Sequence, residues 1–202
     1  MTPPITCFFL EPTALFQRYL RRYTPSGFAV EHYHDVVVNV EQIELTEEQR
    51  EGYETMPDCR DPRWPQRCDC GYIFPAQDKW QAGLHRLYRR SDNQQLIPVH
   101  GKMPPGAMYY ATWRKDYGQL GRPGPDGEFL HVILPDGRSW CPDDHAVNCT
   151  KPDDYKHKCW VRHGQPPLVT VDKVGLTCAA GAGSIVCRGW HGFLRAGQLL
   201  AC

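Results

Sequence analysis

The chain has 202 residues, and its 23 lysines and arginines equal its 23 aspartates and glutamates in number. This zero net charge argues against a protein that binds nucleic-acid backbones, because such proteins carry a basic excess. Its 18 glycines and 18 prolines argue against a helix bundle, and no apolar run reaches the roughly 20 residues of a membrane helix. The N-terminal residues lack the basic start of a signal peptide, so we expect a cytoplasmic protein.

The first half of the chain is predicted to form strands, one short helix and a cysteine-rich loop. Residues 7–10 and 36–45 are rich in aromatic and β-branched side chains, which favours strands. The Thr-Glu-Glu-Gln pattern at 46–49 is typical of a capping box and predicts a helix that ends near Tyr53. Residues 56–75 show no periodicity, so we expect a loop that something other than a hydrophobic core orders.

The second half is predicted to consist mostly of hairpins. Residues 76–91 combine helical and alternating spacing, and we favour extended structure there. Residues 104–113 indicate a turn followed by one helical turn. Alternating side chains around Pro-Asp-Gly predict a β-hairpin over 128–140, and residues 184–194 predict a second hairpin. We therefore expect a mainly β fold (β-rich α+β) with few short helices, in one compact zinc-stabilised domain over residues 1–202.

Ten cysteines without a recognisable signal peptide indicate metal ligands or buried thiols more than disulfides. Cys59, Cys68 and Cys70 lie in a zinc loop predicted at 56–75, and a glycine follows the Cys-x-Cys pair as in a metal-binding knuckle. Zinc takes thiolate and imidazole ligands, and it can order loops that hydrophobic packing does not order. We therefore predict one structural zinc ion here. Buried thiols and a redox role are the alternatives. We favour Cys178 as the fourth ligand. The other candidates are Cys149, Cys159, Cys187 and His157.

Aspartates, histidines and cysteines also gather between residues 143 and 163. Surface polar residues together with two buried thiols are one interpretation. A second zinc ion bound by Cys149, His157 and Cys159 is another. A third is that one histidine or aspartate of this segment belongs to an active site.

The C-terminal residues 178–200 are predicted to form a hairpin of catalytic type. If residues 188–189 form a two-residue turn, Val186 lies opposite His191, and Ser184 and His191 share a face as diagonal neighbours. A serine beside a histidine is the nucleophile–base pair of covalent hydrolysis. The preceding small residues expose backbone amides that could hold an oxyanion. These residues are Gly181, Ala182 and Gly183. The alternative is a closely packed loop of small residues with a surface histidine.

Three segments resemble a bacterial and phage family known as a domain of unknown function: Cys68-Asp69-Cys70-Gly71, Gly183-Ser184-Ile185 and the strand at 187–194. Its members carry a Cys-x-Cys-Gly knuckle, a Pro-Ser-Ile segment and a Cys- and His-bearing strand. Some are encoded beside ubiquitin-like proteins and their conjugation enzymes. The resemblance implies a zinc-containing serine peptidase that cleaves such a ubiquitin-like protein. Gly183 stands where the family has proline, and the long middle segment resembles phage-encoded relatives.

We therefore predict a zinc-stabilised serine hydrolase, with Ser184 as nucleophile, His191 as general base and Asp143 as the third member. Asp172 and His163 are the alternatives to Asp143. The expected partner is a protein or peptide substrate, cut at a peptide or isopeptide bond, and neither nucleic acid nor membrane is expected. From the resemblance we further expect that the substrate is a ubiquitin-like protein. We also expect that the protein is encoded by a phage and is located in the cytoplasm of a bacterial host cell. The alternative is a non-enzymatic zinc-binding phage protein, structural or host-directed, whose tryptophans and tyrosines anchor a partner.

Overall fold

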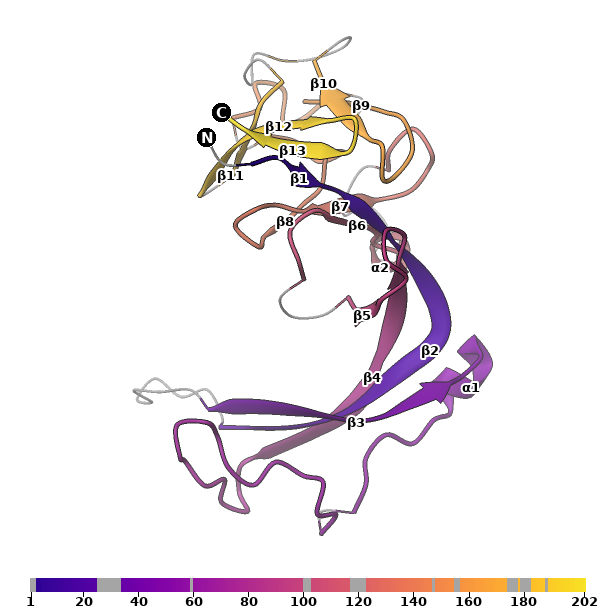
Figure 1. The fold of residues 1–202 in the computed structure, drawn as a ribbon, viewed down its shortest axis with the longest axis vertical. Coiled ribbons are helices and arrows are strands. Elements are labelled where there is room, and N and C mark those ends of the chain that lie inside the picture. Colours follow the sequence, from indigo (N-terminus) through magenta and orange to yellow (C-terminus); the bar gives the residue numbers. More distant parts are fainter. Residues whose placement is uncertain are drawn as a thin grey trace. The chain divides into compact units, whose positions relative to one another are not determined.

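The computed structural model describes residues 3–24, 34–58, 60–99, 103–116, 123–146, 148–154, 157–173, 178, 183–187 and 189–202. Within these ranges it contains thirteen strands and two short helices, α1 (Glu47–Glu51) and α2 (Trp113–Asp116). The predicted mainly β fold is therefore confirmed (Figure 1). Neither described helix has the length and apolar character needed to cross a membrane.

The chain divides into two compact units. Unit 1 comprises residues 1–11, 90–95 and 101–202, and unit 2 comprises residues 12–89 and 96–100. The long strands β2 (Phe8–Tyr23) and β4 (Lys79–Arg90) contribute residues to both units. That residues 1–202 act as one domain stays a prediction.

Unit 2 is built on the antiparallel pairing of β2 with β3 (Asp35–Glu44), which runs from Leu15 opposite Glu44 to Tyr23 opposite Asp35. β4 neighbours β2, and β5 (Leu96–Pro98) pairs with β4. The strands predicted over 36–45 and 76–91 are confirmed. The capping box at Thr46 is also confirmed, although the helix ends at Glu51 rather than near Tyr53.

A buried arginine ties the cysteine-rich loop of unit 2 to this sheet. Arg22 of β2 is 2% exposed. Its guanidinium donates to the backbone carbonyls of Pro65 and Pro75 and lies 3.9 Å from the centre of the Trp80 ring. These partners offset the cost of removing a charge from water. The loop therefore has an anchor of its own besides any metal that its cysteines bind.

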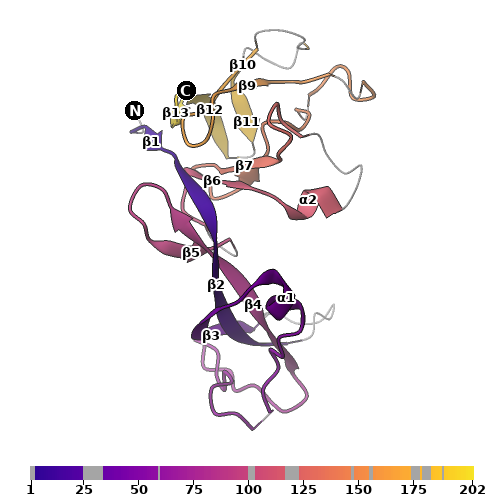
Figure 2. The ribbon, with the colours of Figure 1, turned by 90° about the vertical axis from the view of Figure 1, so that its right-hand side faces the viewer.

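The described part of unit 1 forms three sheets (Figure 2). The first has the order β1 (Ile5–Thr6), β13 (Gln198–Ala201), β12 (Trp190–Arg195) and β11 (Ile185–Cys187), with every pair antiparallel. In the second, the start of β2 pairs with β6 (Ala107–Tyr110), followed by β7 (Leu130–Ile133) and β8 (Ser139–Trp140). The third consists of β9 (Val161–His163) and β10 (Thr170–Asp172).

One apolar cluster joins the sheets of unit 1. It combines Met108 and Val132 of the second sheet with Ile185 and Leu194 of the first, and all four side chains are fully buried. Alternation along each strand places these residues on one face, as the sequence pattern requires. The C-terminal hairpin is thereby fixed to the core through its inner face.

The two predicted hairpins are present, and one local expectation is corrected. β7 and β8 form the hairpin expected over 128–140, with Gly137 at φ +82° in its turn. β11 and β12 form the hairpin expected over 184–194. Residues 107–110, within the segment expected to turn and then make a helical turn, are instead strand β6. Pairing of β6 with β7 and burial of its side chains outweigh the local turn signals, and α2 begins only at Trp113.

Candidate metal centres and candidate catalytic hairpin

Four metal-ligating side chains meet in unit 1: Cys149, His157, Cys159 and Cys178. Their sulfur and imidazole nitrogen atoms all lie within 4.8 Å of one another. The Cys159 sulfur is 3.5 Å from His157 Nε2 and 3.8 Å from the Cys178 sulfur. All four donors can therefore face one central position, and the cluster could hold a metal ion.

Local turns position two of these ligands. The Lys151 N–H donates to the Cys149 sulfur at 3.3 Å. The His157 N–H donates to the Asp154 carbonyl at 3.0 Å, which fixes the backbone that carries the imidazole. A backbone N–H directed at sulfur favours the charged thiolate, which is the form that binds metals.

The cluster is largely removed from water. Cys159 is 1% and His157 is 3% exposed, and the half-buried Cys149 and Cys178 pack against the apolar core of unit 1. Burial raises the pKa of the Cys159 thiol to about 12. This thiol is therefore neutral at pH 7 unless a nearby cation compensates the charge of its thiolate.

The cluster corrects the predicted ligand set of the zinc loop. Cys178, the residue favoured as fourth ligand beside Cys68 and Cys70, lies with Cys149, His157 and Cys159 instead. This geometry supports the alternative prediction, in which those three residues bind a metal ion, and it adds Cys178 as a fourth ligand. The sequence could not show the addition, because chain folding alone decides which distant thiol reaches the group.

Three further ligands meet in unit 2: His34, Cys68 and Cys70. His34 Nδ1 lies 3.2 Å from the Cys70 sulfur. Cys59, the third predicted ligand of this loop, lies outside the described residues. Sequence analysis missed His34, which stands next to β3 and far from the knuckle along the chain.

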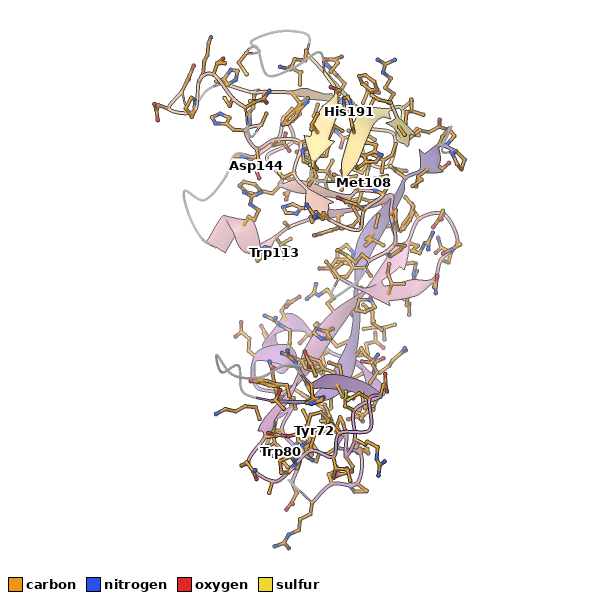
Figure 3. The ribbon with its side chains drawn as sticks, turned by 90° about the vertical axis from the view of Figure 1, so that its left-hand side faces the viewer. Tyr72, Trp80, Met108, Trp113, Asp144 and His191 are labelled. Carbon is orange, nitrogen blue, oxygen red and sulfur yellow. The ribbon has the colours of Figure 1, made fainter. Side chains whose placement is uncertain are left out.

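The C-terminal hairpin has the predicted register: Cys187 pairs with Trp190, and Val186 pairs with His191. Val186 is 65% exposed and His191 is exposed, so both lie on the outer face. Figure 3 labels His191. Ser184 is half-buried, and its carbonyl accepts a hydrogen bond from Trp160 Nε1 at 3.3 Å. Among the described residues, no hydrogen bond joins the Ser184 hydroxyl to His191.

The predicted oxyanion residues are only partly described. Gly181 and Ala182 lie outside the described residues. Gly183 is buried and has φ +86°, a conformation that glycine adopts without strain. Ser184 therefore follows a bend at Gly183, and the amides proposed to hold an oxyanion stay a prediction.

The expectation that Asp143 orients His191 is corrected. Asp143 is 4% exposed and contacts Arg162, with Oδ1 3.4 Å from Nε and Oδ2 3.3 Å from Nη2. Burial raises its pKa, and the arginine works against that rise. Arg162 also binds Asp126 with two hydrogen bonds of 2.6 and 2.9 Å. Within the described residues Asp143 thus belongs to a buried ionic network and makes no bond to His191.

The two alternatives to Asp143 bind each other. His163 Nε2 lies 3.0 Å from Asp172 Oδ1, across the β9–β10 pair where His163 is opposite Thr170. Cross-strand diagonal neighbours reach each other at this spacing. These contacts join the two residues to each other, and they do not place either one as a partner of His191.

A serine–histidine contact that the sequence analysis missed occurs on the second sheet of unit 1. Ser139 Oγ lies 2.7 Å from His131 Nδ1, and Arg114 Nη1 lies 3.3 Å from His131 Nε2. Arginine can only donate, so Nε2 of a neutral ring accepts and Nδ1 carries the proton toward Ser139. Burial, then the Arg114 charge, lowers the pKa of His131 to about 4. This tautomer donates to the serine and does not take its proton, so the pair is not an activated nucleophile.

Comparison with protein-family models, with curated proteins and with solved structures yields no match. The resemblance of the knuckle, the Ser-Ile segment and the histidine-bearing strand therefore stays a prediction. The class of protein that fold and site define is a mainly β protein with Cys/His clusters able to hold metal.

Proposed function

We propose that this protein is a zinc-stabilised, non-enzymatic binding protein, whose zinc ion is held by Cys149, His157, Cys159 and Cys178. The observation that carries the proposal is the convergence of three thiols and one imidazole within 4.8 Å. Three sulfurs and one nitrogen are a common ligand set of structural zinc sites.

The separations between the donors support a tetrahedral ion. Two sulfurs each about 2.3 Å from one tetrahedral ion stand about 3.8 Å apart, and a sulfur and an imidazole nitrogen stand about 3.6 Å apart. The Cys159 sulfur lies 3.8 Å from the Cys178 sulfur and 3.5 Å from His157 Nε2. These two separations therefore match those between ligands of one tetrahedral zinc ion, and the remaining donor atoms lie within 4.8 Å.

A structural role for the ion follows from the completeness of the ligand set. Four protein donors leave no position for an activated water, which a catalytic zinc ion needs. The ion would instead connect the three ligands that precede β9 in the chain with Cys178, which precedes β11. Its binding free energy would then be part of the folding free energy of unit 1.

A binding role is supported by apolar side chains that unit 1 leaves in water. Leu168 is 69%, Val186 65% and Trp113 42% exposed. Tryptophan is among the side chains that most often anchor a protein partner, so Trp113 is the candidate anchor. The expected partner is therefore another protein.

A serine hydrolase is the second candidate, and one observation favours it. The register that places Val186 opposite His191 also places Ser184 on the His191 face. If the pair becomes active, Ser184 attacks the carbonyl of a peptide or isopeptide bond while His191 takes the hydroxyl proton. A ubiquitin-like protein is the substrate that the resemblance suggests.

The test of the zinc proposal compares two buried cysteines of unit 1. Cys159→Ser should lose one zinc ion per chain and melt at a markedly lower temperature. Cys7→Ser is the matched control, because Cys7 is 5% exposed and lies outside both ligand clusters. It should keep its zinc even where the buried hydroxyl lowers its stability. If Cys159→Ser keeps the metal content of wild type, the proposal is wrong.

A further inference from the structure

The second group of ligands differs from the first in number and in exposure. His34, Cys68 and Cys70 place one nitrogen and two sulfurs within 4.8 Å of one another in unit 2. Cys70 is exposed, and Cys68 and His34 are half-buried. The cluster is therefore open to solvent on the side of Cys70, unlike the enclosed cluster of unit 1.

The knuckle that carries the two cysteines is rigid. The Gly71 N–H donates to the Cys68 carbonyl at 2.8 Å, and the Cys68 N–H donates to the Tyr72 carbonyl at 2.8 Å. Gly71 has φ +93°, which closes the turn and which other residues adopt only with strain. The backbone therefore holds both sulfurs toward the same side before any ion binds.

The imidazole of His34 is also held in place. Its backbone exchanges two hydrogen bonds with Thr24, from the His34 N–H to Thr24 Oγ1 at 3.2 Å and from the Thr24 N–H to the His34 carbonyl at 3.0 Å. Its ring stacks on Tyr72 of the knuckle, with centroids 3.9 Å apart and planes 6° apart (Figure 3 labels Tyr72). The Tyr72 hydroxyl in turn donates to Asp78 Oδ2 at 3.1 Å. A ligand ring fixed in this way loses little freedom when a metal binds.

We propose that His34, Cys68 and Cys70 hold a second zinc ion, and that its fourth coordination position takes an exchangeable nitrogen or oxygen donor that this chain does not supply. Catalytic zinc sites with two cysteines and one histidine take water or a substrate atom in the fourth position, so water or an imidazole suits the remaining position. An ion with three protein ligands and one open position can bind a small molecule or a partner's side chain directly. This inference does not depend on the zinc site of unit 1.

Cobalt(II) in place of zinc makes both sites visible, because its d–d absorption reports the ligands of each ion. Wild-type protein should bind two cobalt ions per chain, and Cys68→Ser and Cys70→Ser should each bind one. Cys70 is exposed, so its substitution tests the site without threatening a core. Added imidazole should shift the wild-type spectrum and leave that of Cys70→Ser unchanged. His191→Ala is the matched control, since it removes an exposed histidine outside both clusters, and it should behave as wild type.

Two results would overturn the inference. One is a Cys68→Ser or Cys70→Ser protein that still binds two ions. The other is that imidazole leaves the wild-type spectrum unchanged and alters only the spectrum of Cys59→Ser. Cys59 would then fill the fourth position in the wild-type protein. Failure of the unit 1 proposal is a separate result: wild type would bind one ion, which Cys159→Ser would keep and Cys70→Ser would lose.

Discussion

His131 is the group whose protonation we expect to destabilise unit 1 in mild acid. Its Nε2 faces the Arg114 guanidinium at 3.3 Å, and its Nδ1 contacts Ser139 Oγ at 2.7 Å. Burial, followed by the Arg114 charge, lowers its pKa from 6.5 to about 4, although Asp144 partly opposes the shift. The folded protein therefore holds this ring neutral at pH values at which the unfolded chain protonates it.

The sign of the pH dependence follows from that difference. Because the pKa of the folded state is the lower one, the unfolded state takes up the proton first as the pH falls. The stability contributed by neutral His131 is complete above about pH 6.5 and is lost between about pH 6.5 and 4. A shift of about 2.5 units corresponds to at most about 3 kcal/mol, and solvent screening of a half-buried ring reduces this to about 1–2 kcal/mol.

Urea unfolding at several pH values between 7 and 4.5 measures this loss. His131→Gln keeps a hydrogen-bonding side chain but cannot titrate, so its free energy of unfolding should fall less across this range than that of wild type, by about 1–2 kcal/mol. Acid release of metal affects both proteins equally and cancels in the comparison. Equal slopes for wild type and His131→Gln would refute the reasoning.

Other expected outcomes rest on single contacts. Arg162→Met should lower the free energy of unfolding by about 3–5 kcal/mol in urea titrations, because the buried Asp143 and the half-buried Asp126 would lose their cationic partner; a cost below about 1 kcal/mol would contradict this. Gly192→Ala should lower the melting temperature, since its Cβ would collide with the Leu200 carbonyl oxygen, whereas Gly52→Ala meets nothing and should melt as wild type does. Ser184→Ala should keep metal content and melting unchanged. Fluorophosphonate labelling of wild type at Ser184 would favour the hydrolase instead.

Local patterns predicted the local structure well. The alternation around Pro135-Asp136-Gly137 and the Thr46 capping box depend only on neighbours in the chain, and both appear as expected. The register of the C-terminal hairpin follows from a two-residue turn between Cys187 and Trp190, so it too could be derived.

Contacts between distant segments could not be derived in this way. Ten cysteines allow many ligand sets, and only the fold places Cys178 beside Cys159 and His34 beside Cys70. Asp143 illustrates the same limit. Its acidic side chain suits either an active site or an ion pair, and the position of Arg162 decides for the ion pair.

The structure also explains why a serine beside a histidine is weak evidence of catalysis. Ser139 and His131 touch, yet Arg114 fixes the tautomer that cannot accept the serine proton. A sequence pattern carries no information on the atoms around the second ring nitrogen. The geometry of that nitrogen, rather than the presence of the pair, decides whether the serine is activated.

Zinc K-edge X-ray absorption of the Cys70→Ser variant tests the metal centre of unit 1 most directly, because this variant should keep that ion alone. We expect one zinc ion per chain, with three sulfur scatterers at about 2.3 Å and one nitrogen at about 2.0 Å. This is the ligand set of Cys149, Cys159, Cys178 and His157. A protein that binds no zinc, or a zinc ion surrounded mainly by oxygen, would contradict the account.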